Sequence, residues 1–80
     1  MPTILTENGY RLFFYANERT EPPHVHVDYQ GARAKFWIQP VCLARNLGMT
    51  AAQLSKAEDL VLKHEKLIRE KWDEFFSKKS

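Results

Sequence analysis

The sequence EPPHVHVD at residues 21–28 decides how the rest of the chain is arranged. Two prolines fix the φ angle and remove backbone donors, so a loop ends at the second proline and a strand follows it. Side chains alternate along a strand, which places His24, His26 and Asp28 on one face and the two valines on the other. If the valines enter a core, the imidazoles and the carboxylate face outward, and we expect that face to carry the function.

A second strand pairs with this one in a register that the sequence itself specifies. Gln30 and Gly31 are typical of a turn between strands at residues 24–29 and 32–38. The predicted register pairs Tyr29 with Ala32, Asp28 with Arg33, Val27 with Ala34, His26 with Lys35, Val25 with Phe36 and His24 with Trp37. Apolar pairs then share one face and polar pairs the other, whereas a slip of one residue would bury charge. The predicted binding face therefore contains His24, His26, Asp28, Arg33, Lys35 and Trp37.

The residues before this hairpin predict another hairpin. Asn8-Gly9, a strong turn signal, separates strands at about residues 3–6 and 10–15. Whether the two hairpins join is open at this point. If they join in the same orientation, Arg11, Phe13 and Tyr15 lie on the binding face.

The C-terminal half predicts a long helix. Residues 41–47 suit a short strand or a helical turn equally well. Thr50 and Gln53 then form a capping box that starts a helix over about residues 51–77, with apolar side chains at helical spacing. The chain is therefore expected to be a single α+β domain over residues 1–80. Its four-stranded antiparallel sheet, made of two hairpins, has one long C-terminal helix packed on one face.

The end of this helix and the composition both bear on partners. The helix exceeds the sheet in length, so Trp72, Phe75 and Phe76 are expected to overhang as an interface, and a homodimer would cover them.

A net charge of +2 and a pI near 8.8 permit nucleic-acid binding without requiring it. The single cysteine, Cys42, excludes an intramolecular disulfide. With no signal peptide and no long apolar run, the expected location is cytoplasmic.

Several segments together also resemble a known family. They are MPTI at residues 1–4, the aromatic strand at 10–15, EPPHVHV at 21–27, AKFW at 34–37, LAR at 43–45 and a helix with His64, Trp72, Phe75 and Phe76. This pattern resembles the bacterial domain-of-unknown-function 4160 family over essentially the whole chain. The resemblance implies a short cytosolic protein, often encoded beside another short protein in the manner of toxin–antitoxin pairs. It implies no catalytic residue.

Two functional hypotheses follow. The first is an interaction module of the toxin–antitoxin type that binds a partner protein through the binding face and the helix end, with RNA or DNA as a further candidate ligand. Cations interleaved with aromatic rings on a sheet are typical of RNA recognition. The second is a small metal-independent endoribonuclease in which His24 and His26 act as acid and base while Arg33 and Lys35 hold phosphate.

Metal binding through His24-Val25-His26 is a further alternative, with zinc as the candidate ion. It needs a third ligand. His64 is unsuitable because the helix stripe places it on the valine side of the sheet, where we expect it to bond a backbone carbonyl or a tyrosine. No metal ligand and no cofactor are therefore assigned.

Overall fold

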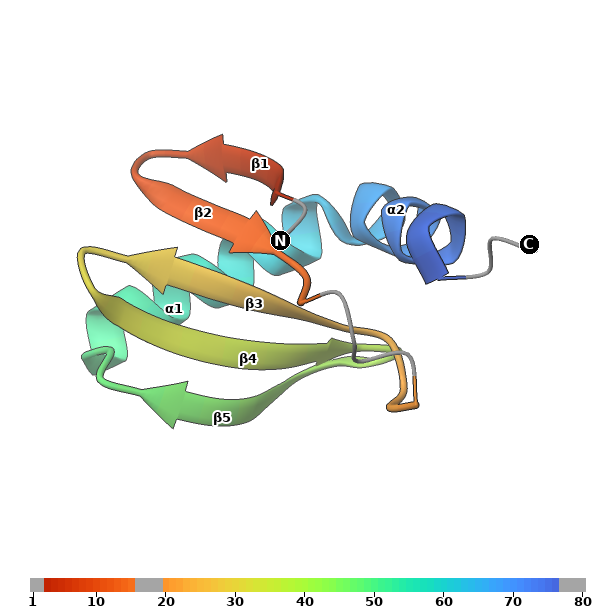
Figure 1. Cartoon of the computed structure of the whole chain (residues 1–80). Coiled ribbons are helices and arrows are strands. Elements are labelled where there is room, and N and C mark those ends of the chain that lie inside the picture. The colour runs from red at the N-terminus through yellow and green to blue at the C-terminus, as the bar shows by residue number, and fades with distance from the viewer. Residues whose placement is uncertain (1–2, 16–19, 77–80) are drawn as a thin grey trace.

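The computed structural model describes residues 3–15 and 20–76 as one antiparallel sheet with two helices on one of its faces (Figure 1). The elements are β1 (Thr3–Glu7), β2 (Tyr10–Phe13), β3 (His24–Tyr29), β4 (Ala32–Ile38), β5 (Val41–Leu47), α1 (Ala51–Lys63) and α2 (Glu65–Phe76). The strands follow one another in chain order across the sheet. The α+β class is as predicted, but the predicted four strands and single helix are wrong.

The β3–β4 hairpin has the register that the sequence predicts, with all six residue pairs in place. Strand β2 pairs with β3, setting Arg11 opposite Asp28 and Phe13 opposite His26. The two hairpins therefore form one continuous sheet. Arg11 and Phe13 join the histidine side of that sheet.

The segment at residues 41–47 is the fifth strand. Its first residues pair with apolar residues of β4 on the core side of the sheet, with Val41 opposite Ile38 and Leu43 opposite Phe36. An irregularity in the register then puts Arg45 opposite Lys35. Pairing with β4 gives this backbone its hydrogen bonds, which a helical turn would have to make locally. In Figure 1 the outer side of β5 is open.

The C-terminal half forms two helices because the chain bends at His64. The predicted capping box starts α1, since the Gln53 N–H donates to Thr50 Oγ1 at 3.1 Å and the Thr50 N–H donates to Gln53 Oε1 at 2.9 Å. His64 leaves helical geometry at φ −109° and ψ 20°. Its Nε2 lies 2.9 Å from Oε1 of Glu7 in β1. This contact to a distant strand favours a bend that the local sequence does not signal.

The core lies between the helices and the valine side of the sheet. Its fully buried side chains include Leu12, Val25, Phe36, Val61 and Ile68. Figure 1 shows α1 behind the sheet and α2 running past the end where β3 begins. No helix among residues 3–15 and 20–76 is long and apolar enough to cross a membrane.

Trp72 belongs to this core, which corrects the prediction that it overhangs as an interface. It is 6% exposed and packs edge-on against Phe14 at 5.2 Å between ring centroids. Phe76 lies half-buried 4.1 Å from it, whereas Phe75 keeps 39% of its surface exposed. The helix reaches beyond the sheet, but it folds its tryptophan back onto the end of β2.

Candidate functional site

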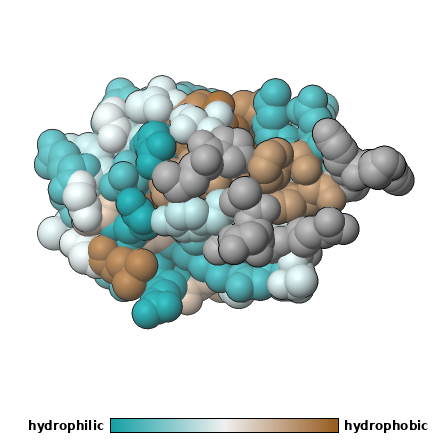
Figure 2. All heavy atoms as spheres, in the orientation of Figure 1, coloured by the Kyte–Doolittle hydropathy of each residue, from teal (hydrophilic) through white to brown (hydrophobic). Residues whose placement is uncertain are grey.

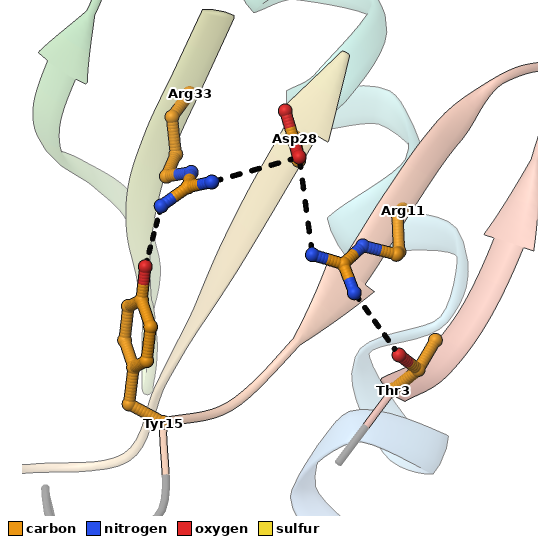
Figure 3. A network of polar contacts seen from close by, with 5 residues as sticks. All are labelled: Thr3, Arg11, Tyr15, Asp28 and Arg33. Atoms are coloured by element: carbon orange, nitrogen blue, oxygen red, sulfur yellow. Dashed lines mark hydrogen bonds and ion pairs between the residues drawn. The ribbon is translucent and has the colours of Figure 1, made fainter. Parts of the chain in front are cut away.

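The face of the sheet opposite the helices, here called the polar face, begins with a row of three charges. Arg11 and Arg33 flank Asp28 from the neighbouring strands, with their Nη2 atoms 3.8 and 3.6 Å from Asp28 Oδ2 (Figure 3). Arg33 also donates a hydrogen bond to the Tyr15 hydroxyl, and Arg11 donates to Thr3 Oγ1 at 3.4 Å. The row is therefore internally paired, and Asp28 neutralises one of its two cations.

The second row is aromatic and lies beneath these charges. Phe13 is fully buried, with the Arg11 guanidinium 4.3 Å above its ring centroid in a cation–π contact. His26 stacks 5.5 Å from Phe13 and meets Tyr15 edge-on at 4.5 Å. Only 7% of His26 is exposed. This part of the polar face is thus a packed layer, in which Phe13 and His26 are not the open rings expected from the sequence.

His24 is more deeply enclosed still. Its exposure is 0%, and its ring lies 5.0 Å from Trp72 and 5.7 Å from Trp37. Its Nδ1 is 2.9 Å from the carbonyl oxygen of Pro22. A carbonyl only accepts, so Nδ1 carries the proton.

The expectation that His24 and His26 form an outward row is therefore wrong. The alternation correctly gave their side of the sheet. However, Trp72 of α2 packs against the His24 ring at the start of β3, and the Pro22 carbonyl lies against Nδ1 of the same ring. An acid or base must reach the proton that it transfers. As the structure describes it, His24 offers a substrate no exposed atom.

An accessible part of the polar face is a hollow of about 340 Å³ beside β5, here called the β5 hollow. It is lined by Glu21, His26, Ala34, Lys35, Trp37, Ala44, Arg45 and Leu47. Lys35 pairs with Glu21 and places its Nζ 4.7 Å from the Trp37 ring centroid. Arg45 stands opposite Lys35, and no carboxylate of the described residues lies within ion-pair distance of it. This hollow combines two cations, one carboxylate and an apolar wall.

Leu47 supplies much of that apolar wall. It is 47% exposed, and Leu43 on the same strand is 43% exposed. Figure 2 views the polar face and shows hydrophilic side chains over much of it, with an apolar patch at the lower left over β5. Arg45 and Leu47 are the residues that the sequence did not single out. Because Arg45 and Leu47 are two residues apart, the strand alternative for residues 41–47 places both side chains on one face.

The remaining predicted site residues are accounted for as follows. Within residues 3–15 and 20–76, no three side chains of metal-binding type come together, so the zinc alternative stays an untested prediction. His64 bonds Glu7 and not the expected carbonyl or tyrosine. Hydrogen bonds from Lys63 and His64 lower the pKa of Glu7 below its usual value. This cluster joins the helix bend to β1.

Comparisons with known proteins give one finding. The model of a family described as a domain of unknown function, DUF4160, matches residues 9–73. The matched region runs from the turn before β2 into α2 and includes every residue that lines the β5 hollow. No curated protein and no solved structure matches the chain.

Proposed function

Because the chain belongs to the DUF4160 family, whose description assigns no activity, we propose a function from the chain's own surface. The protein is a binding module for another polypeptide, as one component of a toxin–antitoxin-type pair. The partner docks along the open edge of β5 and over the adjoining hollow. The observation that carries this proposal is that β5 is an edge strand with two half-exposed leucines, Leu43 and Leu47, at 43% and 47%.

An open edge strand is a ready template for another strand. Alternate residues of β5 turn their backbone N–H and C=O groups away from β4, and extended peptides pair with such groups in many recognition domains. The opposite edge, β1, is five residues long and has an irregular register of its own. Its Ile4 and Leu5 pack against the core. Exposed apolar surface therefore favours β5 as the docking edge.

The charges of the polar face support a polypeptide partner over nucleic acid. Arg11 and Arg33 share Asp28, and Lys35 is held by Glu21. Phosphate binding depends on cations that are free to neutralise the backbone of the nucleic acid. The contacts of these three cations with carboxylates therefore favour a polypeptide partner over a phosphate backbone. The enclosed histidines likewise support a structural part for His24 and His26 and a binding role for the protein.

The test uses the short protein that the family resemblance places beside this chain. The two proteins are co-expressed, the complex is sized by light scattering, and its Kd is measured by calorimetry. Leu47→Lys is expected to weaken the complex about tenfold, corresponding to roughly 1.4 kcal/mol. Leu62→Lys is the matched control, because Leu62 is 52% exposed on α1, on the other side of the sheet.

Hydrogen exchange locates the contact. Amides of β5 should be protected in the complex, while those of β1 should exchange as in the free protein. The proposal is wrong if the complex forms with Leu47→Lys as tightly as with the native chain and β5 amides gain no protection. It is also wrong if no complex forms.

A further inference from the structure

We infer that the β5 hollow binds the carboxylate side chain of an extended partner segment, with an apolar residue two positions away packing on Leu47. This inference rests on the proposed function and specifies the chemistry of the partner. It is carried by the charges around Arg45, by the size of the hollow and by the spacing of residues along β5.

Among the described residues, the lining of the β5 hollow carries more positive than negative charge. Lys35 and Arg45 lie directly opposite each other on β4 and β5, a position that brings Cβ atoms within about 5 Å. Like charges in this position repel each other, and Glu21 pairs with Lys35 while also lying 3.9 Å from His24 Nδ1. Of the described side chains that line the hollow, Lys35 and Arg45 are cations and Glu21 is the carboxylate, and Arg45 has no ion pair with a described carboxylate. A carboxylate from a partner would give Arg45 a counter-charge.

An arginine side chain is well suited to binding a carboxylate. Its guanidinium presents paired N–H donors that match the two oxygens of a carboxylate, and such bidentate pairs are the strongest charged hydrogen bonds. Arg45 is exposed and lines the hollow, so an incoming carboxylate reaches it without displacing Glu21 from Lys35. The native ion pair therefore stays in place when the ligand binds.

The hollow also limits the size and shape of the ligand. At about 340 Å³ it has room for one or two side chains. Residues two apart in a strand point to the same face about 7 Å apart. Arg45 and Leu47 have this spacing, so a strand added beside β5 would set one side chain against each of them. The partner segment therefore carries an acidic residue and an apolar residue at alternate positions.

The test uses a synthetic nine-residue peptide with blocked ends. It consists of threonines with a central glutamate and a valine two residues away on each side, so that either strand direction offers the motif. Matched peptides replace the glutamate with glutamine or lysine. Binding is followed in the full chain by NMR titration, which gives Kd and identifies the amides that shift.

The glutamate peptide is expected to shift amides of β5 and to bind about fivefold more tightly than the lysine peptide, as one surface charge pair provides. Arg45→Glu should reverse that preference. Lys56→Glu makes the same change in net charge on an exposed position of α1, and it should leave the preference unchanged. Arg45→Gln should bind the glutamate and lysine peptides alike.

The inference is overturned if the glutamine peptide binds as tightly as the glutamate peptide, or if Arg45→Glu keeps the native preference. If all three peptides bind equally and shift amides of β5, the proposal that β5 is the docking edge is supported, but the inferred preference for an acidic residue is wrong. If no peptide binds, the inference fails even where the neighbouring protein still forms its complex. An oligouridylate that binds through Arg45 while the peptides do not would make the hollow a phosphate site and overturn it as well.

Discussion

Replacing His24 with alanine should strongly destabilise the protein, although histidine is usually a surface residue. The ring is fully enclosed between Trp37 and Trp72, and its Nδ1–H donates to the Pro22 carbonyl. Truncating a buried side chain of this size costs about 2 kcal/mol through lost packing and a residual cavity. Losing the hydrogen bond and leaving the carbonyl unpaired adds about 1 kcal/mol. The expected loss is about 3 kcal/mol, a large fraction of the stability of a small domain.

Urea unfolding followed by circular dichroism measures this loss, and the midpoint of thermal unfolding should fall by roughly 15 °C. His64→Ala is the matched control, because His64 is half-buried and makes one ion pair to Glu7. Its expected cost is about 0–1 kcal/mol. If His24→Ala loses less than about 0.5 kcal/mol, the ring is not packed as described. The histidine row would then have to be reconsidered as an exposed, functional face.

Two further predictions concern the helices. Glu7→Gln should destabilise the protein at pH 7, because hydrogen bonds from Lys63 and His64 hold the folded-state pKa of Glu7 below its usual value. The stabilisation is complete above that value and is lost as pH falls through the folded-state pKa, so native and variant should converge at pH values below the folded-state pKa in urea titrations; a constant difference would contradict it. Trp72→Ala should cost about 3–5 kcal/mol and Phe75→Ala about 1 kcal/mol or less, because one ring is buried and the other is largely exposed. Equal losses of stability in the two variants would show that the Trp72 and Phe75 rings are equally buried, contrary to the structure.

The β3–β4 register was predictable because two local signals agree on it. The turn at Gln30-Gly31 sets the pairing, and the alternation of polar and apolar residues excludes a slip. Both signals lie within residues 24–38. The same reasoning correctly placed Arg11 and Phe13 on the polar face once β2 was seen to pair with β3.

The features that the sequence did not predict depend on distant contacts. The fifth strand has an irregular register near Ala44, which interrupts the alternation that would have identified it. The bend at His64 has no glycine or proline to mark it. Its partner, Glu7, is 57 residues away in the sequence. Likewise, alternation gives the side of the sheet on which His24 lies, but only the path of α2 determines that Trp72 covers it.

The enclosure of His24 changes what the Pro-Pro-His-Val-His run means for function. Pro22 supplies the carbonyl that fixes the Nδ1 proton, and the next polar residue, His26, packs edge-on against His24 at 5.2 Å. The run therefore joins the polar face to the core through Trp72, and it is a structural element of the fold. A partner that binds this protein must use groups that the packing leaves accessible. Arg45 and Leu47 on the open strand are such groups, and they are where variants should separate binding from folding.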